Sequence, residues 1–518
     1  MRILFLVLLS LELCLAQTDQ QHLSELRKRA VLLYKAGKYG EAVPIARTAL
    51  ELSEKSFGVE HPSTELSLNN LAKLYESQGQ YAIAEPLYLR ALGIHEKSLG
   101  MNDPETATTL DTLASLYFLR GQYAKAEPLF VRARIIRETR LGLDHPFTAT
   151  SLNNLAVLFQ SQGLYAKAQP LFVSALAIRE KTLGAEHPST SESLNNLAEL
   201  YVSLGEYGKA EAPHVRALGI IAKAMGAGHL HTASSLDNLA ALHASRGQFA
   251  KAEPLHLSAL AIREKALGAE HPDTARSLNN LAQFYLSQAS YAQAEPLHMR
   301  ALVILERTLG KEHPDTAKSL TGLGLLYKLQ GQYPKAQLLY LRALAIFEKA
   351  FGGDSPELAT PLNNLAVIYE LQRQYGKAEP LYLRAIAISE KQIGAEHPTN
   401  APALNNLANL YRAQRQYNKA DPLYLRALSI NLRAVGEVHP STAASLGNLA
   451  SMYRAQRYYG KAEPLNVRAV AILEKALGTE HPSTAASRDN LTVLYLESGK
   501  QRQAQKLVRM TQTYWNWG

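Results

Sequence analysis

Apolar residues along this chain recur at the spacing of amphipathic helices, in pairs of segments separated by a short polar break. Residues 62–77 carry apolar side chains at 68, 71, 72 and 75, and residues 81–99 carry them at 84, 87, 88, 91 and 92. Steps of three and four residues predict one apolar face on each segment. Pro62 stands at the start of the first segment, where a helix loses no hydrogen bond to proline. The pattern predicts two helices joined by a tight turn at residues 77–80.

The same pair of segments recurs with a period of 42 residues. A glycine closes each period, and no insertion or deletion separates one such glycine from the next: Gly58, Gly100, Gly142, Gly184, Gly226, Gly268, Gly310, Gly352, Gly394, Gly436 and Gly478. A fixed period indicates a tandem array in which each unit buries its apolar face against its neighbours. The predicted units lie near 19–60, 61–102, 103–144, 145–186, 187–228, 229–270, 271–312, 313–354, 355–396, 397–438, 439–480 and 481–518.

The second unit reads HPSTELSLNNLAKLYESQGQYAIAEPLYLRALGIHEKSLG. It has large, small, aromatic and glycine residues at the positions that define the tetratricopeptide repeat (TPR), namely Leu68, Leu71, Ala72, Tyr75, Gly79, Ala84, Tyr88 and Ala91. The 42-residue form, with its HP, LNNLA, GQY, AEPLY and RAL words, resembles the repeat of kinesin light chains over roughly residues 21–510. This resemblance implies an all-α, right-handed α-solenoid of about twelve helix-turn-helix units, with the first helices lining the concave side. It does not extend to a segment that pairs with a motor subunit, so we expect a free-standing, bacterial array.

Composition adds little to this interpretation. The net charge of +9, from 55 Lys and Arg against 46 Asp and Glu in 518 residues, is only mildly basic and does not indicate a nucleic-acid partner. The single cysteine is Cys14.

Residues 1–16, MRILFLVLLSLELCLA, have a basic Arg2, an apolar run and a small Ala16. This pattern predicts a cleaved signal peptide, an array over 17–518, and a periplasmic or secreted protein. The alternatives are an apolar helix that packs on the first unit of a cytoplasmic protein, and a lipidated Cys14. No later stretch is long and apolar enough to span a membrane.

Histidine precedes proline in eight units. A metal site needs ligands that converge, whereas equivalent positions of successive units lie along the array. We expect each histidine to order the turn into the next helix; they are His61, His145, His187, His271, His313, His397, His439 and His481.

The chain has no HExxH, GxSxG or paired-cysteine motif, and Gly322 and Gly324 lie within a predicted helix, where they mark a softer unit rather than a nucleotide loop. We therefore expect no enzyme, no catalytic residue, no cofactor and no metal.

Two further series recur with the period. Tyrosines from Tyr75 onward occupy the packing position of the repeat. Arginines from Arg90 onward stand near glutamates, which favours a tie between units or a solvated stripe.

Paired asparagines interrupt six of the first helices, where asparagine is a poor helix former. An amide both donates and accepts, so a row of amides can hold the backbone of an extended peptide without reading its sequence. The resemblance also implies that asparagines of this motif line the peptide groove. The alternative is that they bond between neighbouring units. The predicted groove residues are Asn69, Asn70, Asn153, Asn154, Asn195, Asn196, Asn279, Asn280, Asn363, Asn364, Asn405 and Asn406.

Basic residues gather in units eight to eleven, near the ends of the first helices. Arginine binds carboxylates with two parallel hydrogen bonds. We expect an acidic peptide segment or a C-terminal carboxylate to dock there, the alternative being a solvated charged face; the residues are Lys328, Arg373, Arg412, Arg415, Arg454 and Arg457.

Together these features predict a non-catalytic scaffold or adaptor that binds extended peptide segments of other proteins in its concave groove. The first alternative is a protein that binds an anionic polymer, either nucleic acid or an envelope polysaccharide; the second is a structural spacer. Near-identical units also leave open self-association by end-to-end stacking.

Overall fold

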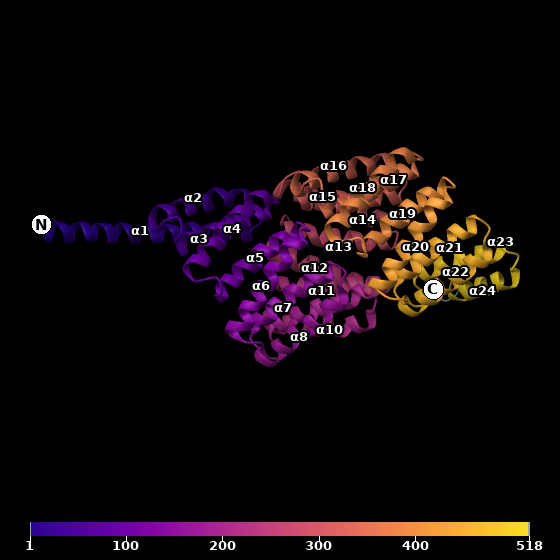
Figure 1. Cartoon of the computed structure of the whole chain (residues 1–518), viewed down its shortest axis with the longest axis horizontal. Helices are drawn as coiled ribbons and strands as arrows, with labels where there is room; N and C mark the ends of the chain where they lie inside the picture. The colour runs from indigo at the N-terminus through magenta and orange to yellow at the C-terminus, as the bar shows by residue number, and fades with distance from the viewer. Residues whose placement is uncertain (1, 516–518) are drawn as a thin grey trace.

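The computed structural model describes residues 2–515, with side chains for residues 19–508. In this range it contains 24 α-helices, one short 3-10 helix and no strand, and Figure 1 shows the helices stacked in pairs. The first helices of the twelve units are α1 (Arg2–Lys35), α3 (Pro62–Ser77), α5 (Pro104–Leu119), α7 (Pro146–Ser161), α9 (Pro188–Ser203), α11 (Leu230–Ser245), α13 (Pro272–Ser287), α15 (Pro314–Leu329), α17 (Ala359–Leu371, preceded by η1 at Pro356–Leu358), α19 (Asn400–Ala413), α21 (Pro440–Ala455) and α23 (Pro482–Glu497). The second helices are α2 (Tyr39–Phe57), α4 (Tyr81–Ser98), α6 (Tyr123–Leu141), α8 (Tyr165–Leu183), α10 (Tyr207–Met225), α12 (Phe249–Leu267), α14 (Tyr291–Thr308), α16 (Tyr333–Phe351), α18 (Tyr375–Ile393), α20 (Tyr417–Ala434), α22 (Tyr459–Leu477) and α24 (Gln501–Trp515). This confirms the predicted solenoid of twelve helix pairs.

The helices begin and end for local reasons. His61 caps α3, because its Nδ1 accepts a hydrogen bond from the backbone N–H of Ser63 at 3.0 Å and Pro62 follows as the first helical residue. Each His-Pro histidine accepts the same bond from the residue two positions on. The turn after α3 passes through Gly79, whose φ of 69° suits glycine. The predicted role of the histidines in the turn is confirmed.

Small and large side chains alternate in the core. Ala72, Ala84 and Ala91 are fully buried, which lets the helices approach closely, and Leu68 and Tyr88 fill the space beside them. The hydroxyl of the tyrosine series reaches the preceding unit, as where Tyr285 donates to Glu253 at 2.7 Å. These tyrosines pack in the core, as predicted, and in several units the hydroxyl also forms a hydrogen bond with the preceding unit.

The arginine series joins neighbouring units along the outer helices. Arg132 bonds to Glu96 at 2.6 Å, and the same pairing spans 36 residues in several further units. This confirms the predicted tie between units. These pairs are partly exposed, so each adds about 0–1 kcal/mol at most.

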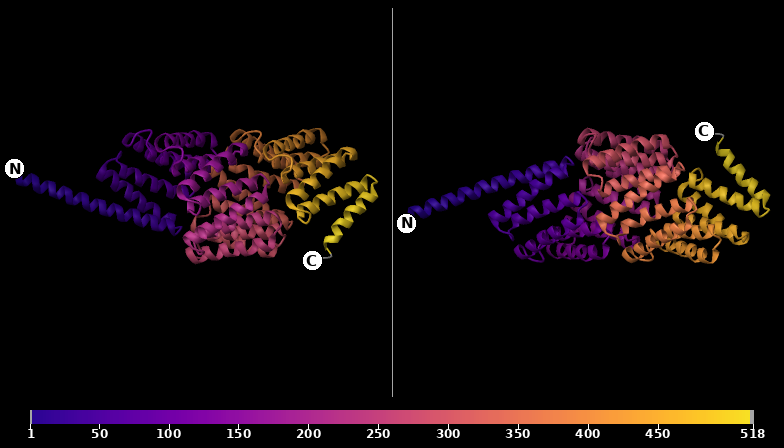
Figure 2. Two further views of the ribbon diagram at one scale, coloured as in Figure 1. Left: turned by 90° about the horizontal axis from the view of Figure 1, so that it is seen from below. Right: turned by 90° about the horizontal axis from the view of Figure 1, so that it is seen from above.

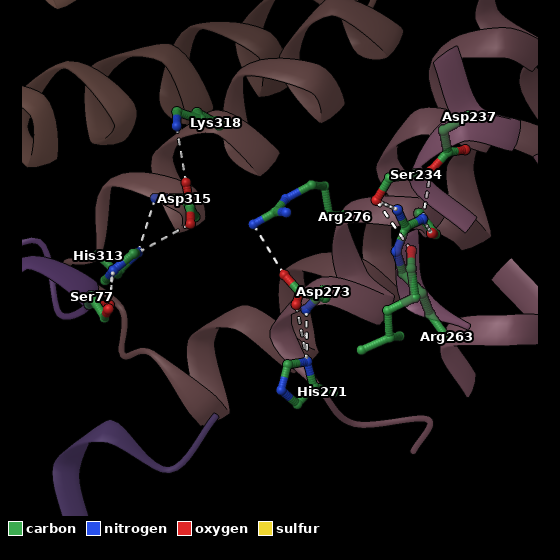
Figure 3. A network of polar contacts seen from close by, with 12 residues as sticks. Ser77, Ser234, Asp237, Arg263, His271, Asp273, Arg276, His313, Asp315 and Lys318 are labelled. Atoms are coloured by element: carbon green, nitrogen blue, oxygen red, sulfur yellow. Dashed lines mark hydrogen bonds and ion pairs between the residues drawn. The ribbon is translucent and has the colours of Figure 1, made fainter. Parts of the chain in front are cut away.

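Successive turns of the superhelix touch each other. His313 Nε2 lies 3.0 Å from the carbonyl oxygen of Ser77, and His397 Nε2 lies 2.9 Å from that of Ser161. The second unit therefore contacts the eighth, and the fourth contacts the tenth. Figures 1 and 2 show the resulting coil, with the two termini at opposite ends of its long axis. Figure 3 shows His313 against the segment that carries Ser77.

The predicted signal peptide, residues 1–16, falls where Met1 and the side chains of residues 2–18 lie outside the described part of the chain. The backbone of α1 runs from Arg2 to Lys35 without a break. Cleavage after Ala16 stays a prediction. Among the described residues, no helix combines the length and apolarity needed to cross a bilayer.

The two glycines of α15 make room for aromatic rings. A Cβ at Gly322 would lie 2.8 Å from His298 Cε1, and one at Gly324 would lie 2.7 Å from Tyr340 Cε1. The helix runs through both glycines from Pro314 to Leu329. They are therefore required by close packing, and the softer unit expected there stays a prediction.

Candidate functional site

The paired asparagines lie in the middle of α3, α7, α9, α13, α17 and α19. The second asparagine of one unit donates to the first asparagine of the unit before it: Asn196 to Asn153 at 2.9 Å, and Asn406 to Asn363 at 3.0 Å. Asn154 likewise hydrogen-bonds to Asp111, which stands in the first position of the preceding unit. The amides thus form bonds from one unit to the next.

The first asparagine also bonds forward and sideways. Asn195 Nδ2 lies 3.4 Å from Ser235 Oγ, and Asn405 Nδ2 lies 3.2 Å from Ser445 Oγ, both in the following unit. Asn69 bonds within its own helix to Glu65. Many of the donors and acceptors of these asparagine side chains therefore form hydrogen bonds inside the protein. The alternative role, a bond between neighbouring units, is present at Asn195 and Asn405.

Three hollows open beside asparagines on the first-helix side. One of about 490 Å³ between α9 and α11 is lined by Asn195, Asn196 and Asn238. A second of about 580 Å³ is lined by Asn405, Asn406 and Asn448 together with residues of α8 to α10, so it lies between two turns of the superhelix. Asn363 borders a third of about 440 Å³. These hollows are mixed polar and apolar surfaces, as a peptide backbone with side chains would need.

In two of the units that lack the asparagine pair, a buried ion pair takes its place. Asp237 replaces the first asparagine and binds Arg263, and its other oxygen lies 2.9 Å from His256 Nδ1. Figure 3 shows Arg263 between Asp237 and Ser234. Asp111 and Arg137 repeat this arrangement in the third unit. Burial raises the pKa of Asp111, while Arg137 opposes that shift.

Sequence reasoning missed these arginines. Arg137, Arg179 and Arg263 share one register of the second helix and are 3%, 3% and 6% exposed. A comparison of the units with one another would have revealed them. Two of the three units with arginine at this register also have aspartate, Asp111 or Asp237, at the position of the first asparagine. Arg179, whose own unit keeps Asn153, instead donates to Glu192 of the following unit at 2.9 Å.

Three consecutive units also carry a buried histidine where six other units have tyrosine or phenylalanine. His214 and His298 donate through Nδ1 to Asn195 and Asn279 at 2.9 and 2.8 Å. Their Nε2 atoms have no hydrogen-bond partner within the described residues. Burial lowers the pKa of each to about 4. The described residues offer no group of three or more His, Cys, Asp and Glu side chains placed to hold a metal.

The six predicted basic residues fall into two series. Lys328, Arg412 and Arg454 end first helices and are half-buried. Burial lowers the pKa of Lys328, Arg412 bonds to Tyr424, and Arg454 Nε lies 4.0 Å from Glu497. Arg373, Arg415 and Arg457 occupy the turn three residues later, are exposed, and have φ of 59°, 59° and 62°. The first series is thus partly engaged inside the protein, whereas the second faces solvent.

Comparison with known proteins agrees with this architecture. The family model described as tetratricopeptide repeat matches residues 23–97, 64–139, 105–181, 147–223, 231–302, 273–349, 330–391, 399–475 and 441–512. No curated protein matches the chain.

Solved structures that are similar to it include the following three. Nearly identical TPR-like repeats of a putative kinesin light chain from Podosopora anserina are 30% identical, over 40% of this chain and 98% of that one, with a TM-score of 0.34. BtubC (BKLC) from P. vanneervenii is 27% identical, over 46% and 94%, with a TM-score of 0.37. A Rap protein complexed with Competence and Sporulation Factor is 15% identical, over 80% and 99%, with a TM-score of 0.45.

The family match, which recurs along residues 23–512 and covers nearly all of them, agrees with the twelve helix pairs of the structure. The chain belongs to the tetratricopeptide repeat family.

Proposed function

We propose that this protein is a non-catalytic scaffold that binds extended peptide segments of other proteins along its first helices. The observation that carries the proposal is the association of asparagines with the hollows: Asn195 and Asn196 border one, and Asn405 and Asn406 border another. Amides at regular intervals suit a peptide backbone, which offers a donor and an acceptor at each residue.

The basic residues suggest the chemistry of the bound segment. The exposed guanidinium groups of Arg373, Arg415 and Arg457 have no side-chain partner within the described residues, and they recur once per unit. An acidic segment or a C-terminal carboxylate would complement them. The apolar start of the chain supports export as part of the same proposal, which N-terminal sequencing of the mature protein tests directly.

The test uses a displayed library of random peptides as the probe. Peptides selected on the wild-type chain are measured against Asn195→Ala/Asn196→Ala, Asn405→Ala/Asn406→Ala and Arg373→Glu/Arg415→Glu/Arg457→Glu variants. Each variant must keep its helical signal and unfolding midpoint, because the asparagines also bond between units. Loss of binding in either asparagine variant supports the groove, and loss in the charge-reversed variant supports an acidic segment.

Selected peptides that bind all variants as tightly as wild type would show that the groove residues are wrong. The polymer alternative makes a different prediction. Binding of a polyanion such as heparin or single-stranded DNA would grow with polymer length and fall steeply with salt. A peptide held by amides shows a modest salt dependence.

A further inference from the structure

The turn between the two helices of each unit has a left-handed residue, and the first six units all use glycine there. These are Gly37, Gly79, Gly121, Gly163, Gly205 and Gly247, with φ from 66° to 70°. Each faces the cap of the unit six places later. A Cβ at Gly37 would lie 2.8 Å from Pro272 Cδ, and one at Gly205 would lie 2.7 Å from His439 Cδ2. At Gly79, Gly121 and Gly163 the proline of the facing unit is closer still. Glycine is therefore required because another turn of the superhelix covers it.

The last six units follow a different rule. Their turn residues are Ala289, Gly331, Arg373, Arg415, Arg457 and Gly499, which we call the free edge. Nothing lies within 4 Å of a Cβ at Gly331 or Gly499, because no other turn of the superhelix covers them among the described residues. Left-handed backbone disfavours every residue that has a Cβ. Glycine would suit all six positions better, so the fold does not require the three consecutive arginines.

The repeat itself shows which surface would fit the free edge. Within the chain, the turn between the two helices of one unit contacts the helix cap of the unit that follows six units later. In a second copy that continued the superhelix, the third, fourth and fifth units would therefore face Arg373, Arg415 and Arg457. Their caps are Asp103, His145 and His187, each followed by proline. Those prolines would have to occupy the space of the arginine Cβ atoms.

We propose that the free edge is an interaction surface shaped for a second copy of this chain, and that Arg373, Arg415 and Arg457 prevent that copy from docking. Without the arginines, heterologous end-to-end contacts of this kind would not close, and they would give filaments.

The test compares three forms of the full chain by light scattering and sedimentation over a wide range of protein concentration. Wild type is expected to keep the mass of one chain, 57.0 kDa. The Arg373→Gly/Arg415→Gly/Arg457→Gly variant is expected to at least double its average mass as concentration rises. The matched Arg373→Lys/Arg415→Lys/Arg457→Lys variant keeps the Cβ, the length and the charge, and is expected to stay a single chain.

A fourth form locates the partner surface. Pro146→Glu and Pro188→Glu, added to the glycine variant, place bulk on the caps that are uncovered in a single chain and are expected to reverse the association. Helix N-termini accept glutamate, so these changes leave the fold intact. The proposal is overturned if the glycine variant stays a single chain, if wild type already associates, or if the glutamates leave the association unchanged.

Discussion

The imidazole Nε2 of His313 lies 3.0 Å from the carbonyl oxygen of Ser77, 236 residues earlier in the chain. The same ring caps its own helix, because Nδ1 accepts from the backbone N–H of Asp315 at 3.0 Å. One neutral tautomer, with the proton on Nε2, satisfies both bonds. A single residue type therefore starts a helix and joins two turns of the superhelix.

Replacing His313 and His397 with asparagine separates these two roles. Asparagine is a good helix cap but cannot reach the carbonyl of the earlier turn. We expect unchanged helix content and a measurably larger radius of gyration by small-angle X-ray scattering. His145→Asn is the control, because in the fourth unit no earlier turn lies beneath the cap. Equal radii for all variants would show that the contact does not hold the coil closed.

Gly121 and Gly331 offer a matched pair for the packing between turns. Both have left-handed backbone, with φ of 66° and 75°, but only Gly121 lies against a proline, Pro356. Alanine should cost about 1 kcal/mol at either position through the backbone. At Gly121 it should cost about 1–3 kcal/mol more through overpacking. Denaturant midpoints of the two variants measure the difference, and equal shifts would contradict the close contact.

Acid should destabilise the middle of the array. The pKa of His214 and that of His298 are lowered to about 4, so both are neutral in the folded protein at pH values where the unfolded chain binds protons. The contribution of each neutral histidine to the free energy of unfolding is then fully present above pH ~6.5. It is lost as the pH falls toward ~4, by up to about 3 kcal/mol for each histidine. The His214→Gln/His298→Gln variant keeps a donor for each asparagine and should flatten this part of the pH profile. Thermal unfolding between these pH values checks the prediction.

The buried pair Arg263–Asp237 can be tested by copying the next unit. Asp237→Asn alone leaves a buried guanidinium without its carboxylate, which should destabilise the protein by about 3–5 kcal/mol. Adding Arg263→Leu produces the combination that unit 271–312 already contains, with Leu305 and Asn279. The double variant should recover most of the loss. A double-mutant cycle in denaturant gives the coupling, and additive losses would show that the two residues act independently.

The repeat period predicted the helices well because each one is specified locally. Pro62 and His61 set the start of α3, and Gly79 sets the turn, all within one unit. The contact of His313 with Ser77 could not be predicted, because it depends on how far each unit rotates against the next. That rotation is summed over six units, so no single residue encodes it. The three arginines of the free edge were visible in the sequence. Which surface they face, however, depends on the same summed rotation between units, which no single residue specifies.

The candidate groove was predicted only in part. The asparagines do lie on the first helices, but their bonds to one another, such as Asn196 with Asn153, depend on the separation of neighbouring units. The buried Arg137 and Arg263 escaped notice because a charged residue on an outer helix is normally exposed. Comparing units with each other, rather than with an ideal repeat, would have paired them with Asp111 and Asp237.

The contacts between turns give the array a second dimension. An ordinary solenoid is a row in which each unit interacts with the one before and the one after. Here a unit also contacts the unit six places away in the next turn of the superhelix. The molecule is therefore a small rolled lattice with two repeat directions. A lattice requires equal cells: one extra residue in any unit would displace each later cap from the glycine beneath it. The unvarying spacing from Gly58 to Gly478 is the condition under which every cell is in register.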